Sequence, residues 1–200
     1  MHTKLIEYYD GPQKLIGRVI YNDEPVSYYP AIIIFPAFEG PGEFSVTYAQ
    51  KLAEHGFLVF IADMYGDAKV GYTLPDCINL ILPFLGDRAL VRKRALLALD
   101  ALVQQNPNVA KNKVAAIGFC FGGMCVLELA RSGAHIKAAA AIHGVLAQSN
   151  LPTHPLKAKL LVIHGYQDPQ VPPNALSAFA QEMASVNYHD WIFTFLGDAQ

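Results

Sequence analysis

Residues 114–123 read VAAIGFCFGG, and they join a short apolar run to an apolar helical segment over residues 124–130. The stretch matches the strand–turn–helix pattern Gly-x-Ser-x-Gly, with Cys120 in the place of the serine. A turn this tight leaves no room for neighbouring side chains, and Gly118 and Gly122 provide that space. Gly123 lets the helix approach the sheet closely. We therefore predict that Cys120 lies at a sharp turn between a buried strand and a helix.

Four further apolar runs of similar length lie on either side of this stretch, at residues 31–35, 57–62, 138–142 and 159–164. Most are rich in β-branched or aromatic residues and apolar on both faces, which is typical of parallel strands covered on both sides. The alanine-rich run at 138–142 is compatible with a helix end, and its place in the alternation favours a strand.

Helical periodicity separates these runs. Apolar residues recur on one face around residues 46–53, along a longer helix at about 87–105, and after Pro172-Pro173. Near the N-terminus, residues 5–9 and 14–20 flank Gly11-Pro12 and predict an antiparallel hairpin. Residues 190–196 form a last strand. The predicted fold is a doubly wound, mostly parallel α/β sheet with helices on both faces and this hairpin at its N-terminus.

The composition describes an ordinary globular chain. Its 200 residues are 52% hydrophobic and 16% charged, enough apolar surface for one core. The net charge of −2 gives no reason to expect nucleic acid or an anionic membrane as a partner. We expect a cytoplasmic protein for three reasons. The number of cysteines is odd, the N-terminus does not resemble a signal peptide, and no apolar run is long enough to span a membrane.

A cysteine at the start of a helix is suited to nucleophilic chemistry. The partial positive charge at the helix N-terminus favours the thiolate of Cys120, and the backbone N–H of Phe121 would point at an oxyanion. A buried, inert cysteine in a tight turn is the alternative. A dinucleotide-binding loop fits less well, because Cys120 stands where that motif needs a glycine. Cys125 is expected to be a packing residue.

A thiolate nucleophile needs a base and an orienting acid. Asp168 follows the run at 159–164 and should reach the same sheet edge as Cys120. The alternative is a turn-forming aspartate before Pro169. His143 and His164 each precede a glycine at a strand end, and we expect them to be hydrogen-bonded structural groups. His189 opens the last strand, far from Cys120, and is not expected to be the base.

Five stretches together resemble the dienelactone hydrolase family of α/β-hydrolases. They are FPAFEG (35–40), ADMYGD (62–67), IGFCFGG (117–123), HG (143–144) and HGYQDPQVP (164–172). The resemblance implies carboxymethylenebutenolidase-like hydrolysis of small-molecule esters or lactones by a Cys-His-Asp triad, without a cofactor. It makes Cys120 the nucleophile and Asp168 the acid. It also implies a second oxyanion-hole N–H, from Ala37 or Phe38.

The sequence departs from this family at three points. The prototype has a glutamate that influences the thiol, but the position in register is Ala37, and Glu39 lies two residues later. Glu39 either modulates the thiol or is a solvated loop carboxylate. The arginines that hold the prototype's substrate carboxylate have no secure counterpart, and we expect Arg88, Arg92 and Arg94 to form a solvated helix face.

The third departure concerns the triad histidine, which in this family lies just after the last strand. We expect it just beyond Gln200, so that residues 1–200 form a single domain that lacks its C-terminal segment; the alternative is a natural protein that lacks this base. Two other functions stay open: a non-catalytic small-molecule binding module, and a thiol sensor in which Cys125 would have to reach Cys120. No His, Asp or Glu grouping has convincing metal-ligand spacing.

Overall fold

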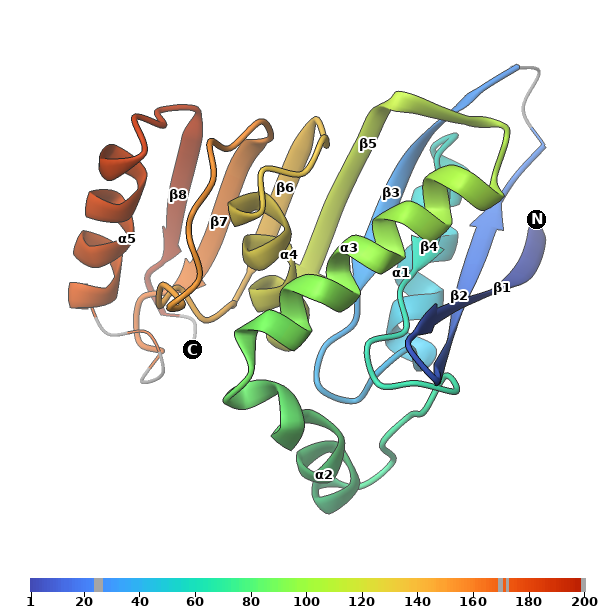
Figure 1. Ribbon diagram of the computed structural model, residues 1–200, viewed down its shortest axis with the longest axis horizontal. Coiled ribbons are helices and arrows are strands. Elements are labelled where there is room, and N and C mark those ends of the chain that lie inside the picture. Colours follow the sequence, from blue (N-terminus) through green and yellow to red (C-terminus); the bar gives the residue numbers. More distant parts are fainter. Residues whose placement is uncertain (24–26, 169–170, 172, 199–200) are drawn as a thin grey trace.

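The computed structural model describes residues 1–23, 27–168, 171 and 173–198. These residues form five helices and an eight-stranded sheet of order β1-β2-β4-β3-β5-β6-β7-β8 (Figure 1). The strands are β1 (His2–Asp10), β2 (Gln13–Tyr21), β3 (Tyr29–Phe35), β4 (Leu58–Ile61), β5 (Val109–Phe119), β6 (Ala138–Ile142), β7 (Lys159–Gly165) and β8 (Trp191–Leu196). The helices are α1 (Glu43–Glu54), α2 (Leu74–Leu85), α3 (Arg88–Gln105), α4 (Phe121–Arg131) and α5 (Pro173–Ser185).

The sheet is antiparallel at one edge and parallel elsewhere. β1 and β2 form a hairpin whose turn holds Gly11 at φ 58°, and β2 also pairs antiparallel with β4. From β4 to β8 every neighbouring pair is parallel. The predicted α/β fold with an N-terminal antiparallel hairpin is therefore confirmed. Each predicted strand and helix is present, with bounds that differ by a few residues.

Helices lie on both faces of the sheet. On one face α3, α4 and α5 pack on the larger core cluster, which contains Ile33, Phe35, Ala116 and Val162. On the other face α1 packs through Ala49 and Ala53 on a smaller cluster. No described helix is both long enough and apolar enough to cross a membrane.

Helix α2 is the one element that the apolar periodicity does not predict. It contains Pro83, and its few polar residues, Asp76 and Asn79, lie three positions apart on one side of an otherwise apolar helix. A capping box marks its start: the Thr73 side chain accepts a hydrogen bond from the backbone N–H of Asp76, and the Asp76 carboxylate accepts one from Thr73. The spacing Thr-x-x-Asp was the available sequence signal.

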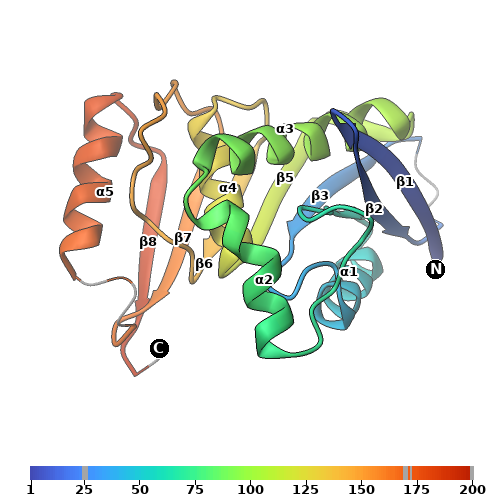
Figure 2. The same ribbon diagram turned by 60° about the horizontal axis from the view of Figure 1, so that its bottom comes forward.

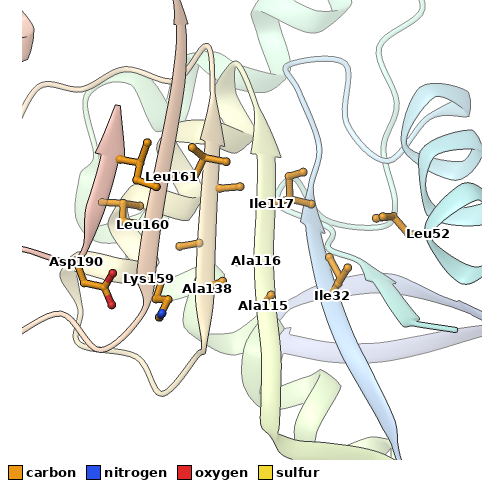
Figure 3. A pocket seen from close by; sticks show the side chains of 13 residues that line it. Ile32, Leu52, Ala115, Ala116, Ile117, Ala138, Lys159, Leu160, Leu161 and Asp190 are labelled. Carbon is orange, nitrogen blue, oxygen red and sulfur yellow. The ribbon is translucent and has the colours of Figure 1, made fainter. Parts of the chain in front are cut away.

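The face that carries α1 has a hollow of about 420 Å³ (Figure 3). Ile32, Ala115, Ala138 and Leu161 contribute to its apolar lining, and Lys159 lies at its rim. Ala138 and Lys159 are the first residues of β6 and β7, so the hollow lies toward the amino ends of these strands. It is therefore far from the edge where ligands of parallel sheets bind.

The carboxyl ends of the parallel strands meet at one edge, and α2 lies at this end of the molecule (Figure 2). Cys120 follows β5 at that edge, His143 follows β6, and Asp168 comes three residues after β7. The fold therefore gathers the candidate site residues from three neighbouring strands.

Candidate active site

Cys120 lies at the sharp turn between β5 and α4. It is the N-cap residue of α4 and has φ 53° and ψ −113°, in the left-handed region that side chains rarely adopt. Strained backbone of this kind costs about 1–3 kcal/mol and is concentrated at functional sites. The turn has the geometry of a nucleophile elbow, which holds the side chain out at the sheet edge.

Close backbone contacts explain the glycines around this turn. A Cβ atom on Gly118 would lie 2.1 Å from the carbonyl oxygen of Gly122. A Cβ on Gly122 would lie 1.9 Å from the carbonyl oxygen of Phe35, at the end of β3. Gly123 similarly packs against Gly144, where an added Cβ would lie 2.8 Å from the Gly144 Cα. The elbow is thus pressed against the loops that follow β3 and β6.

The thiol of Cys120 is partly buried, and its pKa is raised above the usual value. Burial is the largest cause; the charges of Glu39 and Asp168 also raise the pKa, while a hydrogen bond from the Phe121 N–H lowers it. The expectation that the helix N-terminus favours the thiolate is therefore outweighed by desolvation. Cys120 holds its proton at neutral pH and needs a proton acceptor to become a nucleophile.

The loop after β3 is held beside the elbow by Tyr65. The Tyr65 hydroxyl donates a hydrogen bond to the carbonyl oxygen of Phe38 at 2.8 Å, and its ring stacks on Phe121 with centroids 5.6 Å apart. Burial, first of all, raises the pKa of Tyr65 well above its usual value, so the hydroxyl remains a donor. Tyr65 lies within the ADMYGD stretch, but the sequence alone gave it no role.

Asp168 lies buried at the same edge and contacts two histidines. Its Oδ2 atom is 3.0 Å from Nε2 of His143 and 3.5 Å from Nε2 of His164. His164 is fully buried, and burial lowers its pKa, so it is neutral at pH 7. His143 is about one-third exposed. His189 lies outside this group, with Nε2 3.1 Å from Oδ1 of Asn187.

The expectation of a solvated arginine face is wrong. Arg92 pairs with buried Glu128 at 2.9 Å, and Arg88 lies 3.5 Å from the same carboxylate. Arg94 pairs with Asp10 at 2.9 Å. These arginines are packed between α3 and its neighbours because each has a carboxylate partner from a distant part of the chain.

The other two cysteines, Cys77 and Cys125, are buried free thiols. Burial, above all, holds the pKa of Cys125 well above its usual value, which suits a packing residue. Within residues 1–23, 27–168, 171 and 173–198, no group of three or more His, Cys, Asp or Glu side chains is arranged to hold a metal ion.

A strained cysteine elbow after the central strand β5, with an aspartate after β7, the second strand along the sheet, is typical of the α/β-hydrolase class. Residues 16–199 match the dienelactone hydrolase family. The chain belongs to this family.

Among known proteins, a Bradyrhizobium protein named "Probable 2-oxo-3-(5-oxofuran-2-ylidene)propanoate lactonase" is 28% identical over 182 residues, covering 84% of this chain and 71% of its own. The crystal structure of P91, a dienelactone hydrolase-like promiscuous phosphotriesterase from metagenomic libraries, has 36% identity and a TM-score of 0.91. It covers 99% of this chain, which in turn covers 82% of P91. A structure titled m3DLH has 34% identity and a TM-score of 0.90, with the same shares of coverage.

Proposed function

We propose that this protein hydrolyses small-molecule esters or lactones through a thioester formed on Cys120. The observation that carries the proposal is the strained backbone of Cys120 at the N-terminus of α4. A left-handed, non-glycine residue at this point costs stability, and the cost is understandable where the side chain must meet a substrate. A buried cysteine that served packing alone would not need this conformation.

Two backbone N–H groups would stabilise the oxyanion that forms on the attacked carbonyl. The Phe121 N–H already donates to the thiol of Cys120, so it faces the reacting atom. Ala37 or Phe38 would supply the second N–H; the contact of Gly122 with Phe35 and the Tyr65–Phe38 hydrogen bond support this assignment. Such donors contribute about 3–4 kcal/mol to the stabilisation of a transition state.

Asp168 is the proposed acid of the triad. It is buried at the carboxyl edge of the sheet and lies against two imidazoles, as an orienting carboxylate should. The histidine expected just beyond Gln200 remains a prediction, and it would complete the chain order Cys, Asp, His. That order is the one that α/β-hydrolases use.

Ester and lactone substrates are proposed on the basis of the family and of the lactonase name carried by the Bradyrhizobium relative. Arg88, Arg92 and Arg94 are not assigned to a substrate carboxylate, since each already contacts a carboxylate of the protein. We therefore expect uncharged ester substrates to be accepted.

Brief mixing of the full-length protein with an activated ester should leave an acyl group on Cys120, detected by peptide mass spectrometry. The thioester would be transient, so quenching with acid within the first turnover is required. Cys77→Ala is the matched control and should acylate as the parent does, since Cys77 is a buried free thiol in α2 and not part of the elbow. Turnover without any adduct on Cys120 would contradict the proposal, and ligand binding without turnover would favour a binding module.

Glu39 is the proposed modulator of the thiol. Because its negative charge raises the pKa of Cys120, the Glu39→Gln variant should lower that pKa and increase alkylation of Cys120 at neutral pH. The measurement is the pH dependence of the alkylation rate, and Glu43→Gln, in the first turn of α1, is the control. An unchanged profile in Glu39→Gln would make Glu39 a solvated loop carboxylate.

A further inference from the structure

Helix α2 lies at the end of the molecule to which the parallel strands point, and only one narrow side of it is buried (Figure 1, Figure 2). Cys77 and Phe84 are its buried residues; they are seven positions apart and so lie on one line along the helix. Leu80 and Ile81, between them, are half-buried. All other residues of α2 are exposed, so most of its circumference is open to solvent.

A row of exposed apolar side chains runs along another side of α2. Leu74, Ile78, Leu82 and Leu85 follow one another at intervals of four, four and three residues, which places them on one face of the helix. They expose between 47% and 63% of their surface, and Tyr72, two positions before Leu74, exposes 89%. Single exposed apolar residues are normal on a protein surface, whereas a continuous row of them is not. We refer to the four helical residues as the α2 stripe.

The α2 stripe has the size of the apolar centre of an interface. At roughly 100 Å² for each exposed side chain, the stripe and Tyr72 present about 500 Å² of apolar surface. Patches of several hundred Å² on soluble proteins often mark interaction sites. Each partner in a stable pair buries about 800 Å², with an apolar centre and a polar rim. Asp76 and Asn79, which are exposed on the next side of the helix, are suited to the rim.

The charges of α2 favour a second copy of this chain over a lipid surface. Asp76 is the only charged residue of the helix, and it lies with Asn79 on a side separate from the stripe. Amphipathic helices that lie on membranes carry Lys and Arg on their polar face, and α2 has neither. A two-fold interface places the same patch of both copies against each other, so a charge at its centre would meet a like charge. The α2 stripe avoids this repulsion, because it has no charged residue.

We propose that the α2 stripe is the interface of a homodimer in which the α2 helices of two copies pack against each other about a two-fold axis. Ile78, Leu82 and Leu85 are separated by steps of four and three residues, the spacing with which the side chains of paired helices interlock. The dimer does not depend on the chemistry proposed for Cys120, so either proposal can hold without the other.

This interface lies beside the candidate active site of each copy. Phe84, on the buried side of α2, packs edge-on against Phe121, with ring centroids 5.5 Å apart. Its ring also lies against Tyr65, again with centroids 5.5 Å apart. Phe121 directly follows Cys120 at the elbow. Pairing of the two α2 helices therefore fixes the helix that packs on the residue next to Cys120.

Sedimentation equilibrium of the full-length protein, from low to high micromolar concentration, tests the proposal. The parent should have twice the mass of one chain. Leu82→Lys places a cation opposite its own copy and should raise the dissociation constant about 100-fold or more, while lysine keeps the helix. Leu5→Lys is the matched control: Leu5 exposes 57% of its surface on β1, beside 61% for Leu82, and this variant should dimerise as the parent does. Far-UV circular dichroism checks that each variant is folded.

A parent that stays monomeric at the highest concentration would overturn the proposal. A dimer that survives Leu82→Lys would overturn it too, because its interface would then lie elsewhere, and so would loss of the dimer in Leu5→Lys. A monomeric parent that floats with phosphatidylcholine vesicles, and no longer floats as Leu82→Lys, would assign the stripe to a lipid surface instead. None of these results depends on hydrolysis, so none of them bears on the proposed function.

Discussion

Substituting alanine for Cys120 is expected to lower kcat/KM for an activated ester by about 10⁴-fold or more, because the nucleophile and the leaving-group chemistry of the thioester are lost together. The residual rate would come from the oxyanion-hole N–H groups and from binding alone. Steady-state hydrolysis by the full-length protein, corrected for the uncatalysed reaction, measures the effect.

The fold should survive this substitution. The left-handed backbone is no worse for alanine than for cysteine, and the three glycine contacts at the elbow stay in place. Far-UV circular dichroism and the midpoint of thermal unfolding should match the parent, and Cys77→Ala should keep its activity within a few-fold. Activity retained in a folded Cys120→Ala variant would remove Cys120 from the mechanism.

Substituting methionine for Arg131 is expected to lower the free energy of unfolding by about 3–5 kcal/mol. Arg131 is fully buried in α4 and donates to both carboxylate oxygens of Glu182, at 2.8 Å each, and to the carbonyl oxygen of Leu146 at 2.7 Å. Without it, Glu182 is left with the hydroxyl of Thr153 as its hydrogen-bond donor among the described residues. A buried carboxylate without a cation is the cause of the loss.

Urea unfolding measures this effect, and Lys14→Met is the control. Lys14 pairs with Glu7 at 3.6 Å on the surface, where an ion pair contributes only about 0–1 kcal/mol. The double variant Arg131→Met with Glu182→Met should recover part of the loss, because it removes both charges. A loss for Arg131→Met as small as that for Lys14→Met would show that the buried pair contributes little.

Most of the fold follows from patterns that are local in the sequence. Three features of this kind were predicted: the strands that are apolar on both faces, the turn at Gly11, and the apolar face of α1. Each depends on residues only a few positions apart in the chain. Helix α2 was not predicted, although a capping box at Thr73 and Asp76 marks its start in the sequence. Its polar side holds only Asp76 and Asn79, and Pro83 in its body is a residue that usually ends a helix.

The arginines of α3 show where pattern alone misleads. A charged residue on a helix is most often solvated, but Arg92 meets Glu128, which is 36 positions away in the chain, and Arg94 meets Asp10, which is 84 positions away. Nothing near Arg92 or Arg94 in the sequence reports these partners. Burial of the guanidinium groups depends on how α3, α4 and β1 pack.

The sequence by itself determined the fold class, the elbow with Cys120 between Gly118 and Gly122, and the aspartate loop after β7. These features are set by backbone space and strand periodicity, which depend on neighbours in the chain. Only the tertiary structure decided the electrostatics of the site: the raised pKa of the thiol, and the approach of His143 to Asp168 from another strand. Charge and desolvation act through space, so they depend on distances that the order of residues does not state.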